Sequence, residues 1–139
     1  MVGLIAVRTP SAANVMTVSF VSEVAHHPTT LWVSIDQGTY THELLRDVGQ
    51  FSLAMLHDGQ AEVAWACGTV SGRERDKCSS LGLEPRTDFL FLPTALTNTA
   101  CRTRATVDLG THTLFIADLI SGEVNSHLQG RRNLLLSDL

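Results

Sequence analysis

Two long segments in the second half of the chain constrain the fold most. Residues 96–107 and 113–124 are both rich in the apolar and β-branched side chains that strands favour. Asp108, Leu109 and Gly110 separate them, and so short a loop with a glycine in it is suited to a β-hairpin. Long strands joined in this way favour a β-barrel.

Shorter segments of the same kind predict further strands, and three helices interrupt them. The strands cover residues 3–8, 15–21, 30–35, 51–55 and 89–92. The helices cover residues 40–48, 61–67 and 73–80. Thr39 is the expected N-cap of the first helix and Gly49 ends it, while the second helix follows Asp58 and ends at Gly68. The sequence therefore predicts a mainly β protein with short peripheral helices.

Composition predicts one folded domain over residues 1–139. Hydrophobic residues make up 44% of the chain and charged residues only 17%, so the chain is too apolar to be disordered. No linker, charge block or internal repeat divides it. The net charge of -4 leaves no basic surplus for nucleic acid. No apolar run is long enough for a membrane span, so we expect a soluble, cytoplasmic protein.

The three cysteines predict ordinary reduced thiols. Cys67, Cys78 and Cys101 are an odd number with wide spacings, which fits neither a disulfide framework nor a zinc site built on CxxC pairs. Motifs of serine hydrolases, Rossmann folds, P-loops and zincins are absent as well. We therefore expect no metal site.

The first candidate site is the segment of residues 14–19. Small polar and apolar side chains alternate along it, so that Thr17 and Ser19 share one face of a strand. Such a face allows a flat ring system to approach the backbone and offers hydroxyls to its heteroatoms. The alternative is an edge strand whose hydroxyls face water. The candidate residues are Asn14, Met16, Thr17, Val18 and Ser19.

The second candidate site is a strand end that runs through a glycine turn into a helix start, at residues 34–42. Free N–H groups and the positive end of the helix dipole make such a place suitable for an anion, and threonine hydroxyls can add donors. Simple N-capping by Thr39 is the alternative. The candidate residues are Ser34, Ile35, Asp36, Thr39, Thr41 and His42.

Two further residues carry charge or proton-transfer chemistry. Lys77 ends the dense charged cluster of residues 71–77 and could contact a phosphate, and the alternative, which the residues alone favour, is a solvated helix face. His112 begins the second hairpin strand, where an imidazole can hydrogen-bond a carboxamide. A surface histidine on a hairpin is the alternative.

Taken in order, these segments resemble the flavin reductase-like, FMN-binding split-barrel family. The resemblance extends over most of the chain and covers residues 14–19, His27-Pro28 with 31–35, 39–42, 49–56, Ser71-Gly72 with Asp76-Lys77, and 112–118. It implies a six-stranded Greek-key split barrel that forms a homodimer and binds FMN near the subunit interface.

The resemblance also implies roles for the candidate residues. Thr17 and Ser19 would flank the isoalloxazine and ribityl groups, and residues 34–36 would offer backbone groups to the flavin. The phosphate would be held by Thr39 and Thr41, with His42 as a third candidate. Lys77 would supply the full positive charge, and His112 would lie beside the nicotinamide of the co-substrate.

The implied function is an FMN-binding flavin reductase that transfers a hydride from NAD(P)H to flavin, with FAD as a second possible flavin and a monooxygenase as a possible partner. Family members often have Gly-Asp-His where this chain has Gly110, Thr111 and His112, so a carboxylate is missing beside the nicotinamide position. An FMN-carrying electron-transfer protein without a nicotinamide site is therefore the alternative. A barrel that has lost flavin and binds other molecules is a third.

Overall fold

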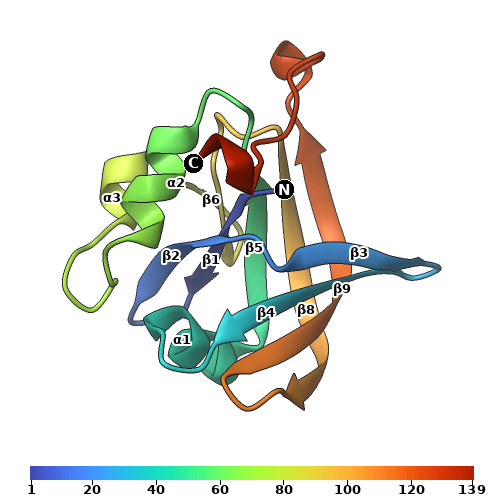
Figure 1. Ribbon diagram of the computed structural model, residues 1–139. Coiled ribbons are helices and arrows are strands. Elements are labelled where there is room, and N and C mark those ends of the chain that lie inside the picture. Colours follow the sequence, from blue (N-terminus) through green and yellow to red (C-terminus); the bar gives the residue numbers. More distant parts are fainter.

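The computed structural model describes residues 1–139 and is built mainly of antiparallel strands (Figure 1). The strands are β1 Gly3–Arg8, β2 Ala13–Val18, β3 Val21–His26, β4 Thr29–Asp36, β5 Gln50–Met55, β6 Glu84–Arg86, β7 Phe89–Phe91, β8 Thr97–Asp108 and β9 His112–Val124. The helices are α1 Tyr40–Val48, α2 Ala61–Gly68 and α3 Cys78–Leu81, and two 3-10 turns follow at Ser126–Leu128 and Leu136–Asp138. No helix has the length and apolarity needed to cross a lipid bilayer.

Seven strands form one curled sheet in the order β2-β1-β5-β8-β9-β4-β3. The expectation of six strands is therefore wrong, and the sheet does not close, because β2 and β3 are its two edges and do not pair. The expected strand at 15–21 instead ends at Val18, and the chain turns before β3. β3 pairs with β4 but is mostly exposed, so it lacks the apolar alternation that would have predicted it.

The long hairpin forms as predicted. β8 and β9 pair from Thr97 with Val124 to Asp108 with Thr113, and two bulges bend the ladder. At its tip, Gly110 adopts a φ of 90° and donates its N–H to Oδ1 of Asp108 at 2.8 Å. A positive φ explains why glycine occupies this turn. β6 and β7 form a separate small hairpin.

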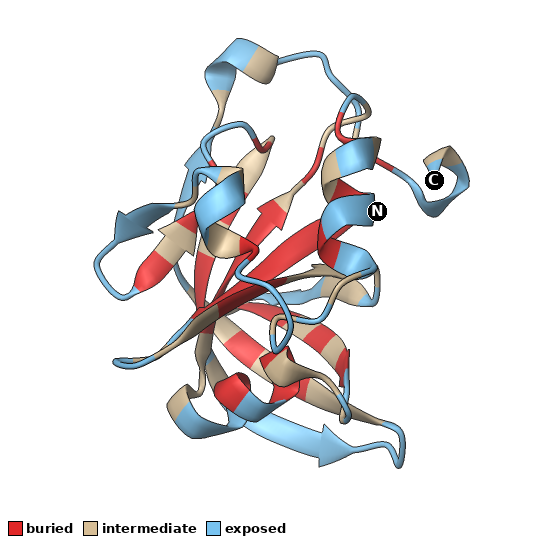
Figure 2. Ribbon diagram, turned by 90° about the vertical axis from the view of Figure 1, so that its left-hand side faces the viewer, coloured by how far each residue is buried: buried red, intermediate tan, exposed pale blue.

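The side chains of β1 alternate between two packed cores. Ile5 and Val7 belong to the cluster that includes residues of α1, while Leu4 and Ala6 belong to the cluster that includes residues of α2. The two helices therefore cover opposite faces of the same part of the sheet (Figure 1). Figure 2 shows the buried positions following the strands and the inward side of the helices.

The first two helices agree with the sequence patterns, and the third differs. The side chain of Thr39 accepts a hydrogen bond from the N–H of His42 at 3.2 Å, as an N-cap does. α2 starts at Ala61, where Gln60 precedes it without a side-chain cap.

The prediction of a helix over residues 73–80 is wrong, because only Cys78–Leu81 is helical. The carboxylate of Asp76 accepts hydrogen bonds from the N–H groups of Cys78 and Ser79, which places the helix start after Asp76. Residues 71–77 form turns instead, and this loop between α2 and α3 borders the candidate site.

Candidate functional site

A hollow of about 220 Å³, here called the strand hollow, gathers most of the predicted residues. It lies along β2, at the point where β4 ends and β9 begins. Its lining includes Met16, Thr17, Val18, Ser19, Ser34, Asp36, Thr39 and His112, all of which were predicted from sequence. The remaining lining residue is Phe20, which the sequence analysis missed. Residues 16–19 and His112, which is distant from them in the chain, thus line the same hollow.

A second hollow of about 240 Å³, here called the loop hollow, adjoins the first. Met16 and Thr39 line both hollows, so the two are neighbours, and together they are here called the trough. The loop hollow lies between β2, the start of α1 and the loop of residues 67–73. Asn14 and Lys77, both predicted, line it. The trough therefore has a strand side and a loop side.

Lys77 is a buried cation without a carboxylate partner. The residue is 5% exposed, and its Nζ donates to the carbonyl oxygens of Cys67 at 3.0 Å and Val70 at 2.8 Å. Its charge has no Asp or Glu within ion-pair distance. Burial lowers the pKa of the Lys77 ammonium, because the charged form loses its hydration. An uncompensated buried charge is costly, and an anion in the loop hollow would offset that cost.

The start of α1 faces the same hollow with free donors. The N–H groups of Tyr40 and Thr41 have no hydrogen-bond acceptor, as is usual in the first turn of a helix. Tyr40 lines the hollow beside Gly38 and Thr39. The Thr39 hydroxyl itself donates to the carbonyl oxygen of Asp36 at 2.8 Å. A helix start and a buried lysine thus border one hollow, and both favour negative charge.

Three predicted residues line neither hollow. Ile35 is fully buried in the core. Thr41 is also fully buried, and its hydroxyl accepts a 2.9 Å hydrogen bond from Nδ2 of Asn14. His42 packs edge-on against Phe115. These side chains hold α1 against the sheet.

The surroundings of His42 disfavour its protonated form. Its Nε2 lies 2.8 Å from the hydroxyl of Thr113. Burial lowers its pKa, and the nearby Arg46 guanidinium lowers it further, while the carboxylates of Asp36 and Asp108 act in the opposite direction.

His112 lies at the mouth of the strand hollow. Its Nδ1 is 2.9 Å from the hydroxyl of Thr111, and its ring lies 6.0 Å from the ring of Phe20 at an angle of 60°. Phe20 is 56% exposed, so an aromatic ring stands at the edge of the trough in contact with water. A large aromatic side chain directly after the alternating segment was the signal for this residue.

Residues 67–73, at the end of α2 and in the loop that follows it, supply lining groups that were not among the candidate site residues. Gly68 lies against Thr17, whose hydroxyl donates to the carbonyl oxygen of Ala64 at 2.6 Å and so ties β2 to α2. Gly72 lies against Asn14. Arg73 lines the loop hollow as well. Glycine allows the backbone to come this close to Thr17 and Asn14. These two contacts become evident only in the folded chain.

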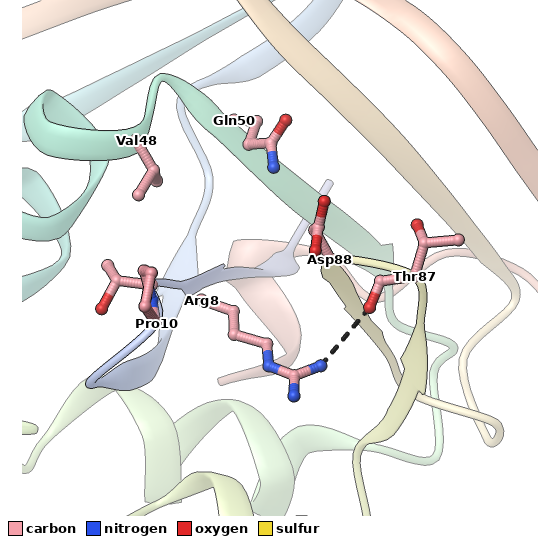
Figure 3. Close-up of a pocket in the computed structure, with 7 residues that line it drawn as sticks. Arg8, Pro10, Val48, Gln50, Thr87 and Asp88 are labelled. Atoms are coloured by element: carbon pink, nitrogen blue, oxygen red, sulfur yellow. Dashed lines mark hydrogen bonds between the residues drawn. The ribbon is translucent and has the colours of Figure 1, made fainter.

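A larger hollow of about 490 Å³ lies at the far end of β1 and includes none of the predicted residues (Figure 3). Arg8 extends across it and donates to the carbonyl oxygen of Thr87 at 3.4 Å. The charged side chains that line it are exposed, so a ligand there would not compensate a buried charge. The trough beside β2 is therefore the better candidate despite its smaller volume.

Comparison with known proteins identifies the family of the chain. Residues 1–138 match the family described as flavin reductase like domain. The chain belongs to this family. This flavin reductase-like domain also resembles the solved structure of flavoredoxin from Methanosarcina acetivorans, with 25% identity and a TM-score of 0.84 over 90% of this chain and 68% of that one.

Two further relatives of this flavin reductase-like domain are reductases by name. The reductase component of FADH(2)-dependent resorcinol hydroxylase from a Rhizobium species is 37% identical over 79% of this chain and 62% of its own length. The styrene monooxygenase flavin reductase from Pseudomonas putida shares the fold, with a TM-score of 0.79 and 23% identity over 88% of this chain and 80% of that one. The chain spans about three fifths of the length of most of its curated relatives, with shares of 63%, 62%, 64% and 58%.

Proposed function

We propose that this domain is a flavin reductase that binds FMN in the trough beside β2 and reduces it with NAD(P)H. The observation that carries the proposal is Lys77, a buried cation with no carboxylate beside it, at the wall of the loop hollow. A flavin that bears a phosphate brings the missing negative charge. FAD also carries phosphate groups and is the second candidate.

The residues fit a phosphorylated flavin along the whole trough. Lys77 and the N–H groups at the start of α1 would hold the phosphate in the loop hollow. Ser19, Ser34 and the backbone of β2 would contact the ring system in the strand hollow. Each hollow alone is smaller than the roughly 300–1,000 Å³ usual for ligand sites, so a flavin needs both.

When bound, the flavin supplies the redox chemistry, and the protein supplies position and shielding. His112 would orient the nicotinamide by a hydrogen bond to its carboxamide, with Thr111 on the other ring nitrogen. The exposed ring of Phe20 would cover the reacting groups and exclude water. Catalysis would then depend on stacking and short distance rather than on a protein acid or base.

The relatives support a role in supplying reduced flavin to a monooxygenase. Two of them, in Rhizobium and in Rhodococcus opacus, are named as reductase components of such systems. Release of reduced flavin to a second protein requires that the flavin can leave the site. We extend this role to the present domain as part of the proposal.

A homodimer is also part of the proposal. The open end of the curled sheet carries an apolar hollow of about 210 Å³, lined by side chains that include Val21, Leu31, Leu53, Met55 and Leu119. An open apolar end of this kind suits contact with a second copy of the chain. Analytical ultracentrifugation would test the assembly, and a monomer at micromolar concentration would contradict it.

Binding of FMN and of riboflavin by the wild type and by Lys77→Met tests the phosphate assignment. We expect the wild type to bind FMN more tightly than riboflavin, and the variant to lose that preference. Lys77→Met keeps the length of the side chain but removes its two hydrogen bonds to carbonyl oxygens, so thermal unfolding of the variant is measured beside its flavin affinity. Arg75→Met is the matched control, because Arg75 is exposed in the same loop and lines neither hollow. Equal affinity of the wild type for both flavins would overturn the assignment.

A flavin carrier without a nicotinamide site is the second candidate function. Thr111 favours it, since a carboxylate is absent beside His112. Anaerobic addition of NADH or NADPH to the protein with FMN separates the two candidates. Rapid bleaching of the flavin band is expected of the reductase, and an unchanged band would indicate the carrier.

A further inference from the structure

An ion pair closes one side of the loop hollow. Nη2 of Arg73 donates to Oε2 of Glu43 at 2.8 Å, and Nη1 donates to the carbonyl oxygen of Gly38 at 3.2 Å. The guanidinium lies over the ring of Tyr40, 5.4 Å from its centroid. Arg73 belongs to the loop between α2 and α3, and Glu43 to α1, so the pair ties these two segments together across the rim of the hollow.

The loop presents Arg73 in a defined position. The hydroxyl of Ser71 accepts the N–H of Arg73 at 3.2 Å, and the carbonyl oxygen of Ser71 accepts the N–H groups of Glu74 and Arg75. Three groups therefore hold the guanidinium, namely a carboxylate, a carbonyl and an aromatic face. Only the carboxylate carries a charge that competes with a bound anion.

The two cations of the loop hollow thus differ in burial and in pairing. Lys77 is buried and has no carboxylate, whereas Arg73 is about half exposed and is paired with Glu43. Arg73 lines the loop hollow together with Lys77, and a guanidinium binds phosphate through two parallel donors. Glu43 opposes this contact because its carboxylate already pairs with the guanidinium. It also places a negative charge in the first turn of α1, where it repels an anion.

We propose that Glu43 weakens the hold on the flavin phosphate by competing for Arg73, and so sets how fast flavin leaves the site. This inference rests on the proposed function. In the free protein Arg73 pairs with Glu43, and in the complex it exchanges that partner for the phosphate. Because Arg73 must first give up its ion pair with Glu43, phosphate binding gains less free energy. The lower affinity appears mainly as faster dissociation of the flavin. A protein that hands flavin to a partner benefits from such release.

Removal of the competing charge tests the proposal directly. Glu43→Gln should tighten FMN binding about fivefold at low salt, the factor expected for a partly exposed ion pair, through a slower dissociation rate. Riboflavin affinity should stay unchanged, because riboflavin lacks the phosphate. Arg73→Gln should weaken FMN binding, and the gain from Glu43→Gln should disappear in the double variant.

Glu74→Gln is the matched control, since Glu74 is exposed in the same loop and makes no ion pair. An unchanged or weaker affinity of Glu43→Gln for FMN would overturn the proposal. So would an equal gain in Glu74→Gln, which would reflect net charge alone, or an equal gain for riboflavin. A wild type that shows no preference for FMN over riboflavin would instead remove the phosphate site itself, so the two failures are distinguishable.

Discussion

The backbone of Gly72 lies directly against the side-chain amide of Asn14, and a Cβ at position 72 would overlap Oδ1 of that amide. Asn14 in turn donates to the buried hydroxyl of Thr41. The contact therefore joins the loop between α2 and α3, strand β2 and helix α1 at the wall of the loop hollow. At this contact no space remains for a methyl group on residue 72.

Gly72→Ala should destabilise the protein by about 1–3 kcal/mol, because the new methyl group must displace Asn14 or move the loop. The free energy of unfolding in urea measures this cost. Asn14→Ala makes room for the methyl group but loses the hydrogen bond to Thr41. The double variant should therefore cost less than the sum of the single variants, and strict additivity would contradict the contact.

The titration of Lys77 should respond to the flavin phosphate. The chain contains a single lysine, so a protein grown with [13C]lysine gives one side-chain NMR signal to follow with pH. We expect a pKa below the ordinary value of 10.5 in the free protein, because burial disfavours the charged form. Addition of FMN should raise that pKa, since a nearby anion favours the ammonium. Riboflavin should raise it less, and an equal effect of both would contradict phosphate binding by Lys77.

Stability should fall as the pH decreases below about 6.5, in part because of His42. The pKa of buried His42 is lowered from 6.5, so below that pH the unfolded chain takes up a proton that the folded protein resists. The loss continues as the pH falls toward the lowered pKa. Unfolding free energies measured across this range for the wild type and for His42→Gln should show a flatter profile in the variant. His57, whose pKa is also lowered by burial, is present in both proteins, so the difference isolates His42.

Thr39 and Thr41 should have separable effects. Thr39→Ala removes the N-cap of α1, which costs about 1 kcal/mol, and it alters the wall that both hollows share, so FMN affinity should fall. Thr41→Val leaves the buried amide of Asn14 without an acceptor, which costs about 1–3 kcal/mol. FMN titration and thermal unfolding of both variants distinguish the roles. A larger loss of FMN affinity in Thr41→Val than in Thr39→Ala would support a direct role for Thr41 at the phosphate.

Replacement of His112 should slow turnover without loss of flavin. In His112→Ala the nicotinamide loses its hydrogen-bond partner, and misplacement of a reacting group can cost up to roughly 100-fold in rate. Stopped-flow reduction by NADH and FMN titration measure the two properties. Comparable losses of rate and of FMN affinity would place His112 at the flavin rather than at the nicotinamide.

Much of the fold was predictable from local patterns. The β8–β9 hairpin follows from two long β-rich segments and Gly110, and α1 follows from Thr39 and Gly49. β3 could not be found in this way, because its exposed residues show no apolar face. The prediction of a helix over residues 73–80 failed because the carboxylate of Asp76 accepts the N–H groups of Cys78 and Ser79, so the helix starts only at Cys78.

The candidate site was predictable as a set of residues but not as a geometry. The side chains of residues 14–19 follow the alternation of a strand, and the strand hollow contains four of the five candidates from that segment. Thr41 and His42 lie on the side of α1 that packs into the protein, and residue types alone do not tell which turn positions face a cavity. Phe20 and Arg73 reach the trough only because the chain bends before β3 and after α2.

The amino-acid sequence by itself determined the β-rich architecture, the hairpin and the family, because periodicity, turn residues and ordered motifs are local properties of the chain. Tertiary structure alone decided that Lys77 is buried without a carboxylate and that Arg73 faces Glu43. The physical reason is that burial and ion pairing depend on how segments distant in the chain pack together, as β2 and α1 do against residues 67–73.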